Sequence, residues 1–179
     1  MSYHTKQDIY SALAPLHKML KERNCTINLL IVGGAALSFN GIESIGTCDI
    51  DTLTEISQEV KDYVDDLGID LNNDVWTYKH CFDDVDFIYD DENPLSSNIN
   101  ISYLSLSGVI LTKMGHSDPD KLAAVAWILK EELSVNLDVE SICNWLSSNG
   151  VDVNDDVEES VSSFLDQVDE SDLEWIEFD

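Results

Sequence analysis

A pair of glycines and a pair of aspartates stand close together in the first third of the chain, at Gly33, Gly34, Asp49 and Asp51. Glycines at the end of a strand let the backbone approach a ligand closely, and the free N–H groups of a following helix attract an anion. Carboxylates one residue apart on a strand can hold Mg²⁺, which usually completes its shell with water and substrate phosphates. The two pairs together predict a site for a metal ion and a phosphate group.

A third carboxylate from a neighbouring strand would complete a site for two metal ions, in which a hydroxyl attacks the α-phosphate of a nucleotide. Asp86 is the candidate, because it lies between Val85 and Phe87 in a predicted strand. We therefore predict Asp49, Asp51 and Asp86 as catalytic and metal-binding residues, with Mg²⁺ as the cofactor. The alternatives are a tight turn without a ligand for the glycines, and solvated strand positions for the aspartates.

The elements that hold these residues follow from the spacing of the apolar side chains. An apolar run at residues 27–32 predicts a buried strand, and a short helix that Gly41 can close is expected after the glycines. In the segment C-D-I-D-T-L, the alternation predicts a strand in which Asp49 and Asp51 share one face while Ile50 points to the core. Further elements are expected as a helix at residues 57–67 and strands at residues 75–78, 85–89 and 99–103.

Helices dominate the two ends of the chain. Thr5 followed by Asp8 resembles a helix cap, and a stripe of apolar residues with helical spacing follows it. From Leu104 onward, apolar stripes predict four helices, near residues 106–114, 122–129, 139–146 and 157–168. The predicted fold is mixed α/β (α+β): an α/β core of residues 1–103 with a small mixed sheet flanked by helices, and a helical acidic region of residues 104–179 packed on it.

The chain is strongly acidic, with 36 acidic and 9 basic residues and a net charge of −27. Phosphodiester backbones are recognised mainly through lysine and arginine, so extended nucleic acid is an unfavourable partner. A basic protein surface or a small metal-chelated nucleotide fits this charge better. After Lys130 no lysine, arginine or histidine occurs, and 16 of the last 49 residues are acidic. This end is either a solvated helical face or a surface that mimics phosphates or docks a basic partner.

The cellular compartment is expected to be the cytoplasm. No apolar run is long enough to span a membrane, and the N-terminus lacks the apolar core of a secretory signal. The four cysteines are scattered, without the spacing of a zinc site or a redox pair. We therefore expect free and mostly buried thiols, as in a reducing compartment.

The order V-G-G-A-A, then Gly41, then G-T-C-D-I-D resembles the signature of the DNA polymerase beta-like nucleotidyltransferase superfamily. The closer likeness is to small bacterial minimal nucleotidyltransferases, including those of abortive-infection and toxin–antitoxin systems. It covers residues 27–130, where the segment I-L-T-K-M-G is similar to the helix that follows the sheet and contains a lysine, here Lys113. The chain has Ile45 where these relatives usually have an arginine, so the clamp on a leaving pyrophosphate lacks its guanidinium.

The resemblance implies that the glycines bind nucleotide phosphates, that the first two acidic residues hold the metal ions, and that a later aspartate completes the set. These roles fall on Gly33, Gly34 and Lys113 for the nucleotide and on the three aspartates for the metal. The leading hypothesis is a nucleotidyltransferase that binds a nucleoside triphosphate with Mg²⁺ and modifies a protein or a small molecule. The alternative keeps the fold without catalysis, as an acidic antitoxin, inhibitor or nucleic-acid mimic that docks a basic partner.

Overall fold

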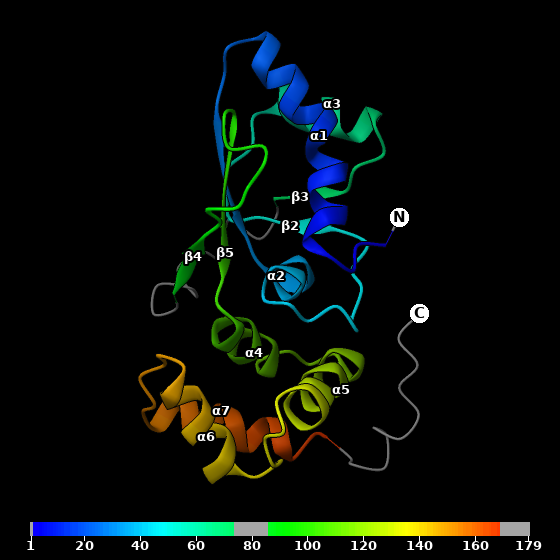
Figure 1. The fold of residues 1–179 in the computed structure, drawn as a ribbon. Helices are drawn as coiled ribbons and strands as arrows, with labels where there is room; N and C mark the ends of the chain where they lie inside the picture. Colours follow the sequence, from blue (N-terminus) through cyan, green and yellow to red (C-terminus); the bar gives the residue numbers. More distant parts are fainter. Residues whose placement is uncertain (1, 74–85, 169–179) are drawn as a thin grey trace. The chain divides into compact units, whose positions relative to one another are not determined.

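A computed structural model describes residues 2–73 and 86–168 of the chain. The chain divides into two compact units, Met1–Ser105 and Leu106–Asp179. The described part of the first unit contains small sheets and helices, and the described part of the second unit is helical (Figure 1). The predicted mixed α/β class is therefore confirmed. Among the described residues, none of the helices is long and apolar enough to cross a membrane.

The main sheet of the first unit has three strands in the order β1-β5-β4. β1 (Ile27–Ile31) runs parallel to β5 (Ile99–Leu104), and β4 (Phe87–Tyr89) runs antiparallel on the other side of β5. Ile31 is opposite Tyr103, and Phe87 is opposite Leu104. The ends of β1 and β5 and the start of β4 therefore lie at the same edge of the sheet.

A short second sheet brings the aspartate pair to that edge. β2 (Ile50–Asp51) pairs in parallel with β3 (Leu71–Asn72). An antiparallel bridge between Ile31 and Thr52 joins β2 to the end of β1. β3 was not predicted from the sequence, because a strand of two residues has no recognisable period.

Three helices accompany the strands of the first unit. α1 (Lys6–Glu22) begins with the predicted capping box, in which Thr5 and Asp8 each bond to the other's backbone N–H. α2 (Gly33–Phe39) begins at the first glycine, two residues earlier than expected, so the glycines belong to the helix rather than ending the strand. α3 (Gln58–Asp66) lies within its predicted range, with Ser57 as its N-cap.

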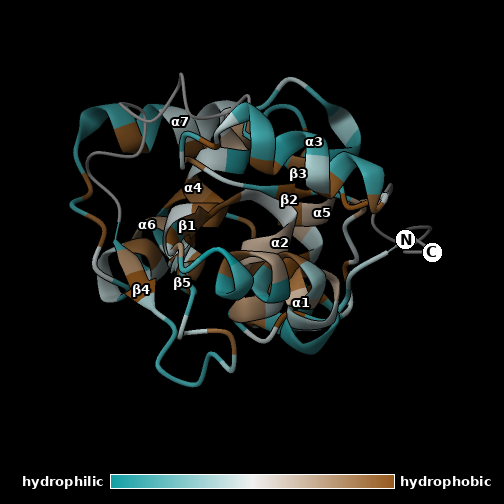
Figure 2. Cartoon of the chain, turned by 90° about the horizontal axis from the view of Figure 1, so that it is seen from above, coloured by the Kyte–Doolittle hydropathy of each residue, from teal (hydrophilic) through white to brown (hydrophobic). Residues whose placement is uncertain are grey.

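The core of the first unit lies on the side of the sheet that α2 covers. Leu29, Ile31, Ile99 and Ile101 are fully buried. Burying a side chain of this size stabilises the fold by about 1.5–3 kcal/mol. Figure 2 shows hydrophobic residues along β1 and mostly hydrophilic residues along α3. A ring cluster extends this core, because Phe39 stacks on Tyr103 at 5.1 Å and meets Tyr10 edge to face at 5.8 Å.

The second unit is a set of helices that pack through the predicted apolar stripes. They are α4 (Leu106–Met114), α5 (Pro119–Trp127), α6 (Val139–Ser148) and α7 (Asp155–Leu165). A π-helical turn, Ile128–Glu132, extends α5 and was not predicted. The core of this unit is made of fully buried side chains, including Val109, Ile142, Leu146, Val161 and Phe164.

Some sequence predictions differ from the structure or lie outside it. The strand expected at residues 75–78 falls outside the described residues, as does Val85. Asp86 precedes β4 instead of lying inside it. The thiols of Cys25, Cys48 and Cys143 are free as expected, but the expectation of burial is wrong for these three, since the first two are exposed and the third is half-buried.

Candidate functional site

The glycine pair and the aspartate pair meet where β1 ends. The backbone N–H of Val32 donates to the carbonyl of Asp51 at 3.0 Å, and that of Leu53 donates to the carbonyl of Leu30 at 2.9 Å. A Cβ added to Gly33 would lie 2.4 Å from Oδ2 of Asp51. Gly33 also has a φ of +64°, which disfavours any residue with a side chain. Position 33 is therefore restricted to glycine by its backbone and by the carboxylate against it.

The side chain of Thr47 lies against Gly34 and also contacts Asp49. A Cβ added to Gly34 would lie 2.8 Å from both Cβ and Oγ1 of Thr47. The hydroxyl of Thr47 donates to Oδ1 of Asp49 at 2.6 Å. This bond fixes the orientation of the carboxylate from the loop that precedes β2. Sequence analysis gave Thr47 a place in the motif but no role.

Asp51 is held from the other side by β3. The side-chain amide of Asn72 donates to Oδ1 of Asp51 at 2.8 Å. Oδ1 of this half-buried carboxylate therefore faces β3, while Oδ2 faces Gly33. Asn72 had no place in the sequence analysis, because β3 itself was not expected. The only sequence signal is the alternation in the short run I-D-L-N-N after Gly68.

The N-terminal segment closes one side of the loop that carries Thr47. Tyr3 and Thr47 exchange two backbone hydrogen bonds, of 2.7 and 2.9 Å. Tyr3 is 2 % exposed. Burial raises the pKa of its phenol, and the charges of Asp70 and Asp49 raise it further. A Cβ added to Gly46 would lie 2.5 Å from the ring of His4, so a side chain at Gly46 would displace this ring.

Asp86 is exposed and lies beside the end of β5. Its carbonyl accepts a hydrogen bond from the backbone N–H of Ser105 at 2.9 Å. The strand order places β5 between Asp86 and the end of β1. Within residues 2–73 and 86–168, no three histidine, cysteine, aspartate or glutamate side chains are grouped to hold a metal ion. The structure thus brings Asp49 and Asp51 to the glycine turn, and a metal-binding role for Asp86 stays a prediction.

Lys113 lies in the last turn of α4, in the second unit, and is half-buried. Its predicted role in nucleotide binding stays a prediction, because it belongs to a different unit from the glycine turn.

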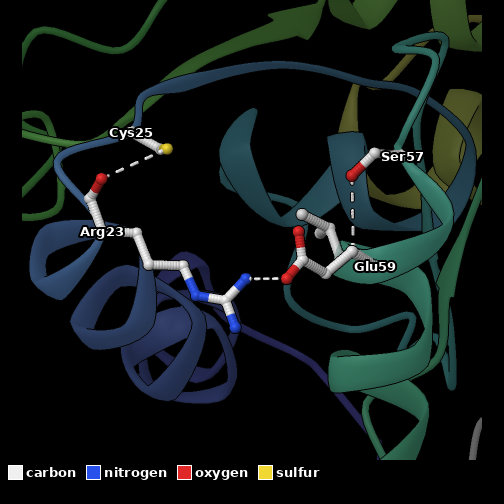
Figure 3. Close-up of polar contacts among 5 residues, drawn as sticks. Arg23, Cys25, Ser57 and Glu59 are labelled. Carbon is white, nitrogen blue, oxygen red and sulfur yellow. Dashed lines mark hydrogen bonds and ion pairs between the residues drawn. The ribbon is translucent and has the colours of Figure 1, made fainter.

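Arg23, the single arginine of the sequence, does not replace the missing guanidinium. It caps the C-terminus of α1 and forms an ion pair with Glu59 in the first turn of α3, close to the Ser57 cap (Figure 3). Arg23 precedes β1 in the chain, whereas Gly33 follows it. The five residues of β1 span roughly 17 Å in an extended strand. The arginine is therefore used to join two helices at the opposite edge of the sheet.

A glycine turn that meets a D-I-D segment beside a small mixed sheet agrees with the resemblance to nucleotidyltransferases. The chain belongs to a family described as nucleotidyltransferase of unknown function (DUF6036), whose model matches residues 11–169. No curated protein and no solved structure matches the chain. The resemblance to nucleotidyltransferases is thus confirmed at the level of the family, while the bacterial minimal branch stays a prediction.

Proposed function

We propose that the protein binds a nucleoside triphosphate with Mg²⁺ through Asp49 and Asp51 and transfers a nucleotide to a hydroxyl group. The observation that carries this proposal is the close approach of the Asp51 carboxylate to Gly33, with 2.4 Å from Oδ2 to an added Cβ. This contact brings together the glycine pair and the D-I-D segment, which are separate in the sequence. Membership of a nucleotidyltransferase family supports the same reaction class.

The donor set fits Mg²⁺. Proteins usually bind this ion through one or two carboxylates and leave the remaining positions to water and substrate phosphates. Asp49 and Asp51 supply two carboxylates, and each accepts a hydrogen bond that fixes its Oδ1, from Thr47 and Asn72 respectively. When bound, Mg²⁺ would supply the positive charge that neutralises the triphosphate.

Each residue of the site has a proposed role in placing the nucleotide. Gly33 and Gly34 let the carboxylate of Asp51 and the side chain of Thr47 lie against the main chain at the end of β1. Asp49 and Asp51 would hold the Mg²⁺ ion, which would supply positive charge for the α-phosphate. Because Ile45 stands in the place of the family arginine, a bound cation would balance more of the charge on the leaving pyrophosphate.

The charge of the whole chain limits the class of molecule that can supply the acceptor hydroxyl. A net charge of −27 repels a long phosphodiester backbone. A hydroxyl of a protein side chain or of a small molecule avoids this repulsion. We therefore propose one of these two acceptor classes rather than an extended nucleic acid.

Isothermal titration with ATP, GTP, CTP and UTP in the presence of Mg²⁺ tests the proposal. At least one nucleotide should bind, and Asp49→Ala and Asp51→Ala should each weaken that binding. A second readout uses the exposed thiol of Cys48, which lies between Thr47 and Asp49. In a variant with Cys25, Cys81 and Cys143 changed to serine, the bound nucleotide should slow alkylation of Cys48. Absence of binding for all four nucleotides at millimolar concentration would refute the proposal.

We also propose a second function, in which the acidic face of α7 docks a basic protein. The first turn of α7 carries Asp155, Asp156 and Glu158, all exposed, while Val161 and Phe164 are buried on its inner side. This distribution gives the second unit a negative outer face. Such a role would suit an antitoxin, an inhibitor or a nucleic-acid mimic and needs no catalysis.

Two variants of equal charge separate this second function from a general effect of acidity. In one variant, Asp155 and Asp156 become asparagine and Glu158 becomes glutamine. In the other variant, Asp62, Asp65 and Asp66 on α3 become asparagine. Binding of poly-lysine should weaken more in the α7 variant and should fall with salt in both. Equal weakening would show that only net charge matters. Asp49→Ala combined with Asp51→Ala should leave this binding nearly unchanged while removing nucleotide transfer.

A further inference from the structure

The contact between Asn72 and Asp51 has a geometry that suits the orientation of a metal ligand. Asp51 and Asn72 are register partners in the parallel pair of β2 and β3. The backbone around Asp51 is fixed by two bonds to β3, from Ile50 N–H to the carbonyl of Asp70 at 2.8 Å and from Thr52 N–H to the carbonyl of Asn72 at 2.9 Å. The amide of Asn72 therefore reaches the carboxylate from a strand that cannot shift independently.

The two oxygens of the Asp51 carboxylate have different neighbours. Oδ1 accepts from Nδ2 of Asn72 at 2.8 Å. Oδ2 lies against Gly33, where an added Cβ would be 2.4 Å away. A rotation of the carboxylate would break the bond to Asn72. An ionised carboxylate only accepts hydrogen bonds, so the NH₂ group of Asn72 must be the side that faces it.

We propose that Asn72 is a positioning residue that sets the orientation in which Asp51 meets a divalent cation. This inference rests on the proposed function of the site. Groups that hydrogen-bond to metal ligands fix the ligand orientation, and their loss typically lowers metal affinity by about 10–100-fold. Mg²⁺ demands a nearly ideal octahedral geometry, whereas Ca²⁺ accepts flexible ones. Asn72 should therefore contribute to the preference for Mg²⁺ over Ca²⁺ as well as to affinity.

The test is the affinity of the whole chain for Mn²⁺, measured from the electron paramagnetic resonance signal of the free ion, with Mg²⁺ and Ca²⁺ as competitors. Asn72→Leu removes the donor at nearly constant volume. It should weaken binding of Mn²⁺ and Mg²⁺ about tenfold and weaken binding of Ca²⁺ clearly less. A general loss of structure would weaken the binding of all three ions alike, so the change in ion preference identifies a positioning role.

Asn100→Leu is the matched control. Asn100 also donates its side-chain amide to a partner on a neighbouring strand, Oδ1 of Asn28 at 2.8 Å, but this bond belongs to the main sheet. The control should bind all three ions as the wild type does. Asn72→Asp keeps the shape of the side chain if the leucine variant does not fold. It removes the amide donor as well, so the preference for Mg²⁺ over Ca²⁺ should again be reduced.

The outcomes distinguish this inference from the proposed function. If the wild type binds the ions and the Asn72 variants match it in affinity and ion preference, the positioning role is overturned and the proposed function stands. If the wild type binds none of the three ions at millimolar concentration, the proposed function fails and the role of Asn72 fails with it. If Asn72→Leu binds Mn²⁺ more weakly and loses the preference for Mg²⁺ over Ca²⁺, both the positioning role and the proposed function are supported.

Discussion

At the scale of single residues, a position can require glycine for its positive φ or for a lack of space beside it, and Gly33 and Gly41 differ in the second respect. Both have a positive φ, +64° and +82°, but a Cβ added to Gly41 meets nothing within 4 Å while one at Gly33 meets Asp51. Alanine at either position should cost about 1 kcal/mol in backbone strain. Only Gly33→Ala should also displace the carboxylate. Urea unfolding and nucleotide titration of both variants measure the two effects.

We expect Gly33→Ala to lose Mg²⁺-dependent nucleotide binding and Gly41→Ala to retain it. The Gly41 variant is the control for strain alone, since its site residues are untouched. Equal losses of binding in the two variants would mean that the contact between Gly33 and Asp51 has no functional importance.

A buried tyrosine–carboxylate contact gives a second prediction at the residue scale. The phenol of Tyr10 donates to Oδ2 of Asp90, and both residues are 5 % exposed. Tyr10→Phe leaves a buried acceptor without this donor, which should lower the free energy of unfolding by about 1–3 kcal/mol. Urea unfolding at neutral pH measures the loss, and Tyr89→Phe is a control because Tyr89 is 56 % exposed. Equal losses in both variants would argue against a specific contribution from the contact.

The same contact makes stability depend on alkaline pH. Burial raises the pKa of Tyr10 well above its ordinary value of 10.0, and the bond to Asp90 raises it further. Above pH 10.0 the unfolded chain therefore releases this proton while the folded chain keeps it. Stability falls as the pH rises through this range. We expect the fall to be shallower in Tyr10→Phe, and a slope equal to that of the wild type would contradict the assignment.

At the scale of elements, the capping box of α1 should make a measurable contribution to the free energy of unfolding. Thr5 accepts the backbone N–H of Asp8, and Asp8 accepts the N–H groups of Thr5 and His4. Thr5→Ala should lower the free energy of unfolding by about 1 kcal/mol. Thermal unfolding measures this loss, with Ser11→Ala, in the interior of α1, as a control for a hydroxyl removed elsewhere in the helix.

The Asp8 half of the box should respond to acid. Hydrogen bonds from Thr5 and His4 hold the pKa of Asp8 below its ordinary value of 3.8. Its contribution to stability is therefore present above pH 3.8 and is lost as the pH falls through the pKa of the folded state. Asp8→Ala should destabilise the protein at neutral pH and approach the wild type in strong acid. A difference that does not change with pH would show that the carboxylate is not responsible.

At the scale of the whole molecule, charge repulsion opposes folding. The net charge is −27, and salt reduces the screening length from about 10 Å at 0.1 M to about 3 Å at 1 M. The urea midpoint should therefore rise as sodium chloride is added. The exposed pairs Lys6–Glu92 and Arg23–Glu59 weaken in salt, but such pairs contribute little. A midpoint that falls with salt would mean that these attractions outweigh the repulsion.

The sequence by itself determined the features that depend on neighbours along the chain. A continuous apolar run predicted β1, and apolar stripes predicted most of the helices, because a repeat of 3.6 residues places a whole helix face against the core. The Thr5–Asp8 spacing predicted the start of α1. The order of glycines, threonine and D-I-D predicted the family, since these residues lie within one short segment.

Only the tertiary structure decided which residues meet at the site. β3 is held by its pairing with β2 rather than by any period of its own, so neither the strand nor the bond from Asn72 to Asp51 could be predicted. The contact of Asp51 with Gly33 likewise depends on the bridge between Ile31 and Thr52. Such pairings join residues about 20 positions apart and are chosen by the packing of the whole unit, which no local pattern encodes.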